Sequence, residues 1–166
     1  MFDISNNKYN SKEEMYAEIM EYAEMLMFEE RDYTANLANI SALLNQVLKD
    51  INWVGFYIAR GNQLVLGPFQ GKVACIRIDK GRGVCGVAFD SGQTQLIANV
   101  HQFPGHIACD SASDSEVVVP ININSKVVAV LDIDSPIKNR FDEVDKKYLE
   151  TLCLLIKDCC DWHQVC

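Results

Sequence analysis

The spacing of apolar residues divides the chain into a helical beginning, a strand-like middle and a helical end. Apolar side chains recur every three or four residues up to about residue 50 and again after residue 141, which is the spacing of one helix face. Between residues 51 and 135 they alternate or form short runs, as in strands. Short strands without long helices between them favour an antiparallel sheet packed by terminal helices, which is an α+β fold.

Three helices are expected outside the strand-like region. Ser11 followed three residues later by Glu14 has the form of a capping box, so the first helix should begin there. The second should follow Asp32, and Asp142 should cap the last. The apolar faces are predicted to carry Met15, Ile19, Tyr22, Ala23 and Leu26 in the first helix, Tyr33, Leu37, Ile40, Leu44 and Val47 in the second, and Val144, Tyr148, Leu152, Leu155 and Cys159 in the last.

Two hairpins and several shorter elements are predicted in the middle of the chain. The turns of the hairpins are expected at residues 60–62 and at Asn124-Ser125, where turn-forming residues separate strand-like runs. In chain order, the expected elements are a strand at 52–59, a strand at 63–67, a strand at 73–78, a short helix at 84–89, a strand at 95–98, and strands at 116–123 and 126–134.

The alternation along two of these strands separates an aliphatic face from a polar and aromatic one. In the first strand, Trp53, Gly55 and Tyr57 share a face, and Val54, Phe56 and Ile58 share the other. In the last strand, the two sets are Val128, Val130, Asp132 and Asp134 against Val127, Ala129, Leu131 and Ile133. We expect the aliphatic faces to meet the helices. Two carboxylates at the end of an apolar strand must then be solvated, paired or used on the opposite face.

The segment 101–120 resembles a polar loop that leads into a strand. Small and polar residues surround Cys109, with His106 three residues before it and acidic residues after it at positions 110, 114 and 116. A thiol on such a loop suits a reactive role. The alternative is a buried cysteine that acts only as a small apolar side chain.

Composition and charge exclude several classes of function. The net charge of −8 and the lack of a basic patch argue against nucleic acid or an anionic membrane as a partner.

No signal-peptide pattern opens the chain, so we expect a cytoplasmic protein. Its seven cysteines then indicate catalysis, redox sensing or metal binding rather than a disulfide framework. No Cys-x-x-Cys pair supports zinc, and the Gly81-x-Gly83-x-x-Gly86 motif lacks the strand–helix–strand context of a dinucleotide site.

Several segments together carry a resemblance to one specific family. They are Asn52-Trp53-Val54-Gly55-Phe56-Tyr57, the stretch Leu66 to Cys75, Gly81-Arg82-Gly83-Val84-Cys85-Gly86, Gly105-His106-Ile107-Ala108-Cys109-Asp110 and Val130-Leu131-Asp132-Ile133-Asp134-Ser135. They resemble the free methionine-(R)-sulfoxide reductases, which are small proteins made of a single GAF domain, and the resemblance covers about residues 53–141.

The resemblance implies a fold and a division of the chain. It implies a GAF-like sheet of about six antiparallel strands, with the N- and C-terminal helices on one face and a loop-covered ligand pocket on the other. The chain would be a single domain over residues 1–166. Its parts would be N-terminal helices in 1–50, the sheet and pocket loops in 51–135 and a C-terminal helix in 141–166.

The resemblance also assigns roles to individual residues. Cys109 would be the catalytic cysteine, and Cys75 would resolve its oxidised form, with Cys85 as an auxiliary. Substrate contact and proton delivery would fall to Trp53, Tyr57, Glu116, Asp132 and Asp134. Apart from the resemblance, the substrate carboxylate needs N–H donors, and we expect backbone ones from the loop between Phe103 and Cys109, which includes Ile107 and Ala108. The resemblance implies free methionine sulfoxide as substrate and thioredoxin as external reductant, with neither a bound cofactor nor a metal, and it leaves room for a homodimer.

These residue types suit the implied chemistry, although other functions stay open. Oxygen leaves a sulfoxide only if it is protonated, and clustered carboxylates disfavour each other's ionisation, so one of them can keep a proton near neutral pH. A GAF-type sensor without turnover is one alternative, and a cysteine hydrolase that uses Cys109 and His106 is another. Four further cysteines match nothing in the family pattern: Cys153, Cys159, Cys160 and Cys166.

Overall fold

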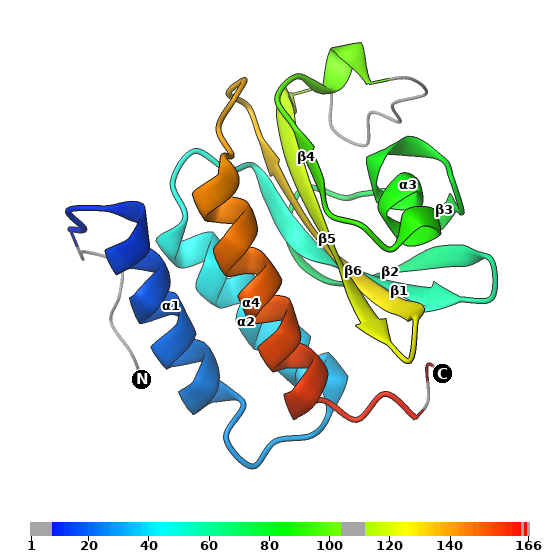
Figure 1. Ribbon diagram of the computed structural model, residues 1–166, viewed down its shortest axis with the longest axis horizontal. Helices are drawn as coiled ribbons and strands as arrows, with labels where there is room; N and C mark the ends of the chain where they lie inside the picture. Colours follow the sequence, from blue (N-terminus) through cyan, green and yellow to red (C-terminus); the bar gives the residue numbers. More distant parts are fainter. Residues whose placement is uncertain (1–7, 104–111, 164, 166) are drawn as a thin grey trace.

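The computed structural model describes residues 8–103, 112–163 and 165 (Figure 1). Two helices precede the strands, two short helices interrupt them and one long helix follows them, in the order expected for an α+β protein. In chain order they are α1 (Lys12–Leu26), α2 (Tyr33–Val47), β1 (Trp53–Arg60), β2 (Gln63–Gly71), β3 (Arg77–Asp79), α3 (Gly83–Ser91), β4 (Gln95–Ile97), the 3₁₀ helix η1 (Val100–Gln102), β5 (Ser115–Ile123), β6 (Lys126–Ser135) and α4 (Glu143–Cys159).

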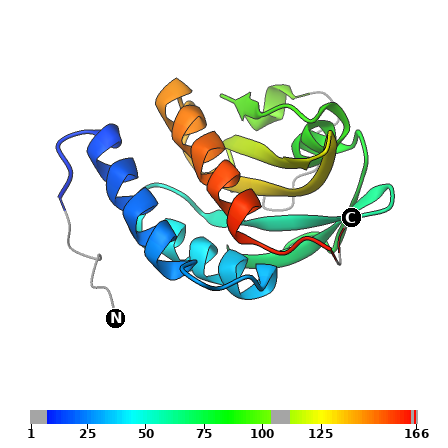
Figure 2. The same ribbon diagram turned by 60° about the horizontal axis from the view of Figure 1, so that its bottom comes forward.

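The six strands form one antiparallel sheet in the order β3-β2-β1-β6-β5-β4. The two ends of the sheet come from the middle of the chain, and β1 pairs with β6 at its centre. Helices α1, α2 and α4 lie on one face, and α3 lies on the other (Figures 1 and 2). The predicted α+β class and the placement of the terminal helices on one face are therefore confirmed.

The helices begin where the sequence predicts. The side chain of Ser11 accepts a hydrogen bond from the backbone N–H of Glu14, and that of Asp32 accepts one from Ala35. Asp142 forms a full capping box with Asp145 at the start of α4. Such caps satisfy N–H groups that the first turn of a helix leaves free.

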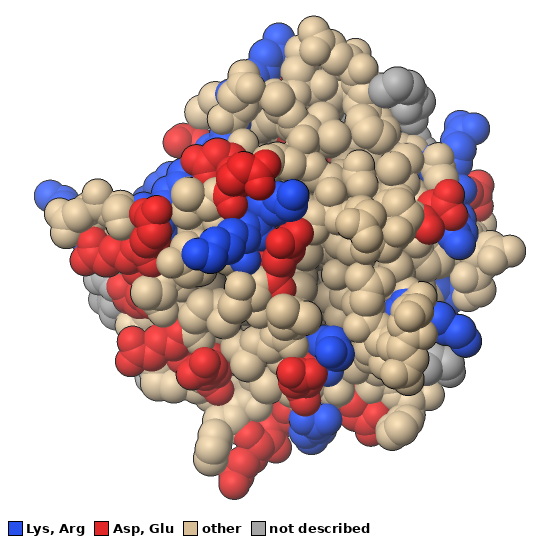
Figure 3. Space-filling model, in the orientation of Figure 1, with Lys and Arg blue, Asp and Glu red and all other residues tan. Residues whose placement is uncertain are grey.

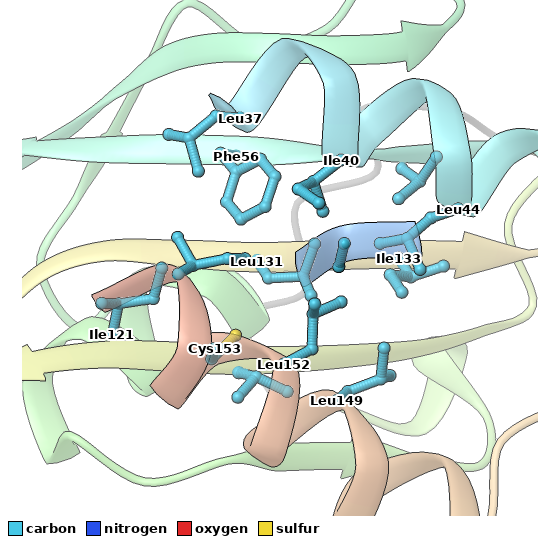
Figure 4. Packing of buried hydrophobic residues seen from close by; sticks show 14 of the residues in the cluster. Leu37, Ile40, Leu44, Phe56, Ile121, Leu131, Ile133, Leu149, Leu152 and Cys153 are labelled. Atoms are coloured by element: carbon cyan, nitrogen blue, oxygen red, sulfur yellow. The ribbon is translucent and has the colours of Figure 1, made fainter. Parts of the chain in front are cut away.

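The main core lies between the helices and the sheet. Figure 4 shows Leu37, Ile40 and Leu44 of α2 packed toward Phe56 and Leu131, while α4 covers β5. The alternate residues of β1 divide as predicted. Val54, Phe56 and Ile58 join this core, whereas Trp53 and Tyr57 join a second cluster on the α3 face.

Charged groups of both signs mark the surface. On the face shown in Figure 3, the blue Lys and Arg side chains lie among red Asp and Glu side chains, and no broad basic area is seen on it. Within the described residues, no helix combines the length and apolar character needed to cross a membrane.

The expected strand at 73–78 is mostly wrong. Strand β2 continues to Gly71, and only Arg77–Asp79 pairs as β3. Residues 72–76 form an irregular connection in which Val73 and Ile76 are 90% and 70% exposed. A run of apolar and branched residues predicts a strand only if the run is buried, and this one is not.

Two face assignments also need correction. The buried face of α4 consists of Asp145, Leu149, Leu152, Cys153 and Ile156, so the predicted face is rotated and its members other than Leu152 lie at the edges. In β6, Ala129, Leu131 and Ile133 face the main core as predicted, but Val127 and Val128 are exchanged. An irregularity in the β5–β6 ladder leaves Val128 without a cross-strand partner, which shifts the alternation by one residue.

Candidate active site

Three carboxylates gather at one end of the central strands, on the α3 face of the sheet. Asp132 and Asp134 lie two residues apart on β6, so their side chains project from the same face. Glu116, near the start of β5, is the cross-strand partner of Asp134. Glu116 and Asp132 are both buried, with 6% of each exposed. The structure thus brings together the three acids singled out from the sequence.

A cysteine from α3 completes this acidic cluster. The Sγ atom of Cys85 lies 3.9 Å from Oε1 of Glu116, and one ligand atom each of Cys85, Glu116 and Asp132 lies within 4.8 Å of the others. Helix α3 can approach the sheet because Gly86 has no side chain: a Cβ there would lie 2.5 Å from the carbonyl oxygen of Asp79. Gly86 therefore has a packing role next to Cys85.

Burial and mutual repulsion hold protons on this cluster. Burial, followed by the charges of Asp132 and Asp134, raises the pKa of Glu116 well above its usual value. Burial raises the pKa of Asp132 to about 6. Burial and the neighbouring carboxylates also raise the pKa of the Cys85 thiol. These shifts favour retention of a proton by the Glu116–Asp132 pair, so the site can offer a protonated carboxyl group beside a carboxylate.

The cluster has unused capacity for a positively charged group. Among the described residues, no Lys, Arg or His forms an ion pair with Glu116 or Asp132. The buried Oδ1 atom of Asp132 has no hydrogen-bond partner there either. Such an atom is costly to leave unpaired. An ammonium group would satisfy it, and Cys85, Glu116 and Asp132 are also of the ligand types that hold zinc.

Aromatic rings form the wall beside the acids. Trp53 and Tyr57 are buried on β1 and stack with ring centroids 5.8 Å apart. Trp53 pairs across the sheet with Asp134, and Gly55, between the two aromatic residues, pairs with Asp132. The predicted aromatic face and the predicted acidic face thus adjoin directly.

Phe69 belongs to this wall and was missed from the sequence. Its ring stacks on Trp53 at 5.3 Å. A Cβ at Gly55 would lie only 2.3 Å from the Cβ of Phe69, so the space that Gly55 leaves is taken by β2. The β1–β2 ladder shifts register between Gly55 and Tyr57, and the sequence signal for this close approach was the lone glycine inside a strand.

Cys75 lies on the irregular segment 72–76, next to the aromatic wall. The indole Nε1 of Trp53 donates to the carbonyl oxygen of Lys72 at 3.1 Å, and the hydroxyl of Tyr57 donates to that of Cys75, also at 3.1 Å. Cys75 is half-buried and free. The structure therefore places the two described candidate redox thiols differently, one beside the aromatic rings and one among the acids.

The predicted nucleophile Cys109 lies outside the described residues, as do His106, Ile107 and Ala108. The residues that flank this segment are described. Phe103 packs against the cluster that contains Trp53 and Tyr57, and the backbone of Val100 donates to the carbonyl oxygen of Asp114 at 2.9 Å. Phe103, the last described residue before this segment, therefore lies on the α3 face of the sheet, and Asp114 directly precedes β5.

The remaining described cysteines lie away from the acids. Cys153 and Cys160 are buried with the main core, and Cys159 is partly buried near the end of α4. All three are free. Burial raises the pKa of the Cys153 thiol and raises that of Cys160 to about 11.

Comparisons with known proteins show what the chain is similar to. A family model described as a GAF domain matches residues 37–158. The free methionine-R-sulfoxide reductase of Escherichia coli is 51% identical over 142 residues, which is 86% of each chain. The structure of Staphylococcus aureus fRMsr in complex with substrate superposes with a TM-score of 0.84 at 48% identity, covering 92% of this chain and 97% of that one.

A second solved structure extends the likeness. The free methionine-R-sulfoxide reductase of Neisseria meningitidis, in complex with its substrate, has a TM-score of 0.89 at 39% identity and covers 95% of both chains. The match of the family model and the identity to these relatives exceed what a shared fold alone would require. The chain belongs to the GAF domain family, in the part of it that includes the free methionine-R-sulfoxide reductases.

Proposed function

We propose that this protein reduces free L-methionine (R)-sulfoxide to methionine. The relatives named for this activity support the proposal, as do the similar structures that contain substrate. The observation that carries it is the buried acidic cluster, in which Asp132 presents an unpaired carboxylate oxygen beside an aromatic wall.

The cluster suits the amino group of a free amino acid. An α-ammonium group would give Asp132 a charged partner and offset the cost of its burial. A residue within a peptide has no such group, so the same cluster would reject it. Trp53 and Tyr57 are placed to enclose the apolar end of the substrate, with the sulfoxide between the two.

The acids also supply the proton that the chemistry needs. The thiolate of Cys109 attacks the sulfoxide sulfur while Glu116, which holds a proton because burial raises its pKa, protonates the oxygen. In sum, the oxygen passes from the substrate sulfur to the sulfur of Cys109. Methionine leaves with its sulfur reduced, and Cys109 is left as a sulfenic acid.

Cys75 is better suited than Cys85 to resolve that sulfenic acid. Cys85 is enclosed by carboxylates that raise its pKa and oppose its thiolate. Cys75 is only half-buried, on a segment without regular structure. Its thiol would condense with the sulfenic acid to give a disulfide and water, and a thioredoxin-type dithiol would reduce that disulfide.

A turnover assay with racemic free methionine sulfoxide tests the proposal. With excess dithiol, the protein should convert half of the racemate and oxidise one dithiol per methionine formed. Cys109→Ser should abolish conversion. Cys75→Ser should slow the resolution of the Cys109 sulfenic acid. Cys159→Ser, on the helical side, is the matched control and should behave as wild type.

Two results would contradict the proposal. Equal turnover of N-acetylated methionine sulfoxide would show that the acids do not select a free ammonium group. Binding of methionine sulfoxide without any methionine formed, in the presence of dithiol, would instead identify a binding module of the sensor type.

A further inference from the structure

The polar atoms of the aromatic wall hold the segment that carries Cys75. Trp53 and Tyr57 are almost fully buried and stacked, so the indole N–H and the phenolic hydroxyl have fixed positions. Both donate hydrogen bonds to backbone carbonyls of one short segment, at Lys72 and Cys75. The Tyr57 hydroxyl therefore contacts the same residue whose sulfur is proposed to react.

The segment is only partly packed against the rest of the protein: Ala74 and Cys75 pack against the cluster that contains Trp53 and Tyr57. Its apolar side chains Val73 and Ile76 point largely into solvent, at 90% and 70% exposure. At its far end, the backbone of Leu66 donates to the carbonyl oxygen of Ile76 at 2.9 Å. Between that anchor and the Trp53–Lys72 bond, the Tyr57 hydroxyl donates a hydrogen bond to the backbone of the residue that carries the thiol.

We propose that Tyr57 is a positioning residue for the resolving step, in addition to forming part of the substrate wall. Its hydroxyl holds the carbonyl of Cys75 and so fixes where the Cys75 sulfur stands relative to the site. This inference rests on the proposed function, because it concerns how the oxidised nucleophile is resolved.

The step that Tyr57 assists is a condensation with strict geometry. The Cys75 sulfur attacks the sulfenic sulfur of Cys109, an S–S bond forms, the S–O bond breaks, and the oxygen leaves as water with the thiol proton. Cys75 is oxidised and the Cys109 sulfur is reduced by the same amount. A disulfide requires a Cα–Cα separation of roughly 4.4–6.8 Å, and misplacement of a reacting group slows such steps steeply.

Removing the hydroxyl alone separates positioning from wall packing. Tyr57→Phe keeps the ring, so its effect can be followed in two separate measurements on the full, reduced chain with one equivalent of methionine sulfoxide and no reductant. Methionine in quenched samples reports the first step. Loss of free thiols, together with trapping of sulfenic acid by dimedone, reports resolution.

The expected signature is a change in the ratio of the two rates. Resolution in Tyr57→Phe should be about three to ten times slower relative to methionine formation, the scale expected for one neutral hydrogen bond, and more sulfenic acid should be trapped. Tyr33→Phe removes a hydroxyl that contacts Arg60 at the surface, and as the matched control it should leave the ratio at the wild-type value.

A Cys75→Ser background tests whether Tyr57 acts through Cys75. There, Tyr57→Phe should no longer alter the lifetime of the sulfenic acid. If packing around the missing oxygen impairs folding, 4-fluorophenylalanine at position 57 fills the same space without a donor and should give the same slower resolution.

Three outcomes overturn the inference, and they are distinguishable. Wild-type resolution rates in Tyr57→Phe would show that the hydroxyl does not position the thiol. An equal slowing in the Cys75→Ser background would show that it acts elsewhere. No methionine from the wild-type protein would instead refute the proposed function, and the inference would fall with it.

Discussion

Two buried aspartates on opposite sides of the sheet have contrasting surroundings. Asp145, at the start of α4, is fully buried, accepts a hydrogen bond from the hydroxyl of Tyr16 at 2.8 Å and forms ion pairs with Lys12 and Arg140. Asp132, on the α3 face, is 6% exposed, has no ion pair among the described residues and keeps one oxygen unbonded.

The difference separates a carboxylate that the chain uses for itself from one that it leaves available. A buried charge is tolerated when hydrogen bonds and counter-charges compensate it. Asp145 is compensated by Lys12 and Tyr16 of α1 and by Arg140, just before α4, and so links the terminal helices. Asp132 has Cys85 and Glu116 beside it but no counter-charge among the described residues, and burial raises its pKa. A cationic ligand that pairs with Asp132 would offset the cost of that burial, which favours its binding.

The largest effect is expected from Asp132→Asn on activity. The substitution removes the charge that would pair with the substrate ammonium, and loss of one partner of a buried ion pair costs about 4 kcal/mol, or roughly 1000-fold in kcat/KM. The free protein should not lose stability. Steady-state kinetics and urea unfolding of the same preparation check both parts, and near-normal kcat/KM would contradict the role of Asp132.

Asp145→Asn should lower the stability of the protein and leave its activity unchanged. It leaves the Lys12 and Arg140 charges without their buried partner, so unfolding should become easier by about 3–4 kcal/mol. Activity per folded molecule should stay close to wild type, because Asp145 lies on the helix side of the sheet. Urea unfolding and active-site titration measure the two quantities. A large loss of kcat/KM with stability unchanged would contradict the assignment of Asp145 to stability and of Asp132 to activity.

The free protein should also become less stable as pH rises through the range in which Asp132 titrates. Because the pKa of Asp132 is raised from 3.8 to about 6 on folding, the folded state holds more protons than the unfolded state between these values. Its contribution is fully present below about pH 4 and is lost as pH rises through 6. The loss amounts to about 3 kcal/mol by pH 7, and Glu116, whose pKa is also raised, extends it upward.

Asp132→Asn isolates this contribution from all other titrating groups. The stability of the variant relative to wild type should rise by about 3 kcal/mol between pH 4 and pH 7. Urea unfolding at several pH values gives the difference directly. Parallel curves for the two proteins would mean that folding does not perturb Asp132.

Much of this arrangement follows from local sequence. Ser11, Asp32 and Asp142 predicted the helix starts because a cap depends on residues only a few positions apart. The face that holds Trp53, Tyr57, Asp132 and Asp134 followed from the two-residue period of strands, and that period held wherever the ladder was regular.

What escaped prediction depends on distant contacts. Val73 and Ile76 resemble strand residues, but the extension of β2 leaves them exposed. Val128 changes face at an irregularity in the β5–β6 ladder, and the residues around it do not predict that irregularity. Asp145 was not recognised as buried, since its partner Lys12 comes from the other end of the chain. The pairing that distinguishes Asp145 from Asp132 is therefore a tertiary property.

The smallest effect is expected when Asp145 loses only one of its cations. Lys12→Met keeps the length of the side chain but removes an ammonium group that contacts both Asp142 and Asp145. The Lys12 side chain is 33% exposed, so solvent screens part of the interaction, and Tyr16 and Arg140 remain as partners of Asp145. Urea unfolding should show a loss of about 1 kcal/mol, with kcat/KM unchanged. A loss as large as that of Asp145→Asn would show that Lys12 alone compensates the buried charge, and the contrast with Asp132 would then rest on one ion pair instead of a network.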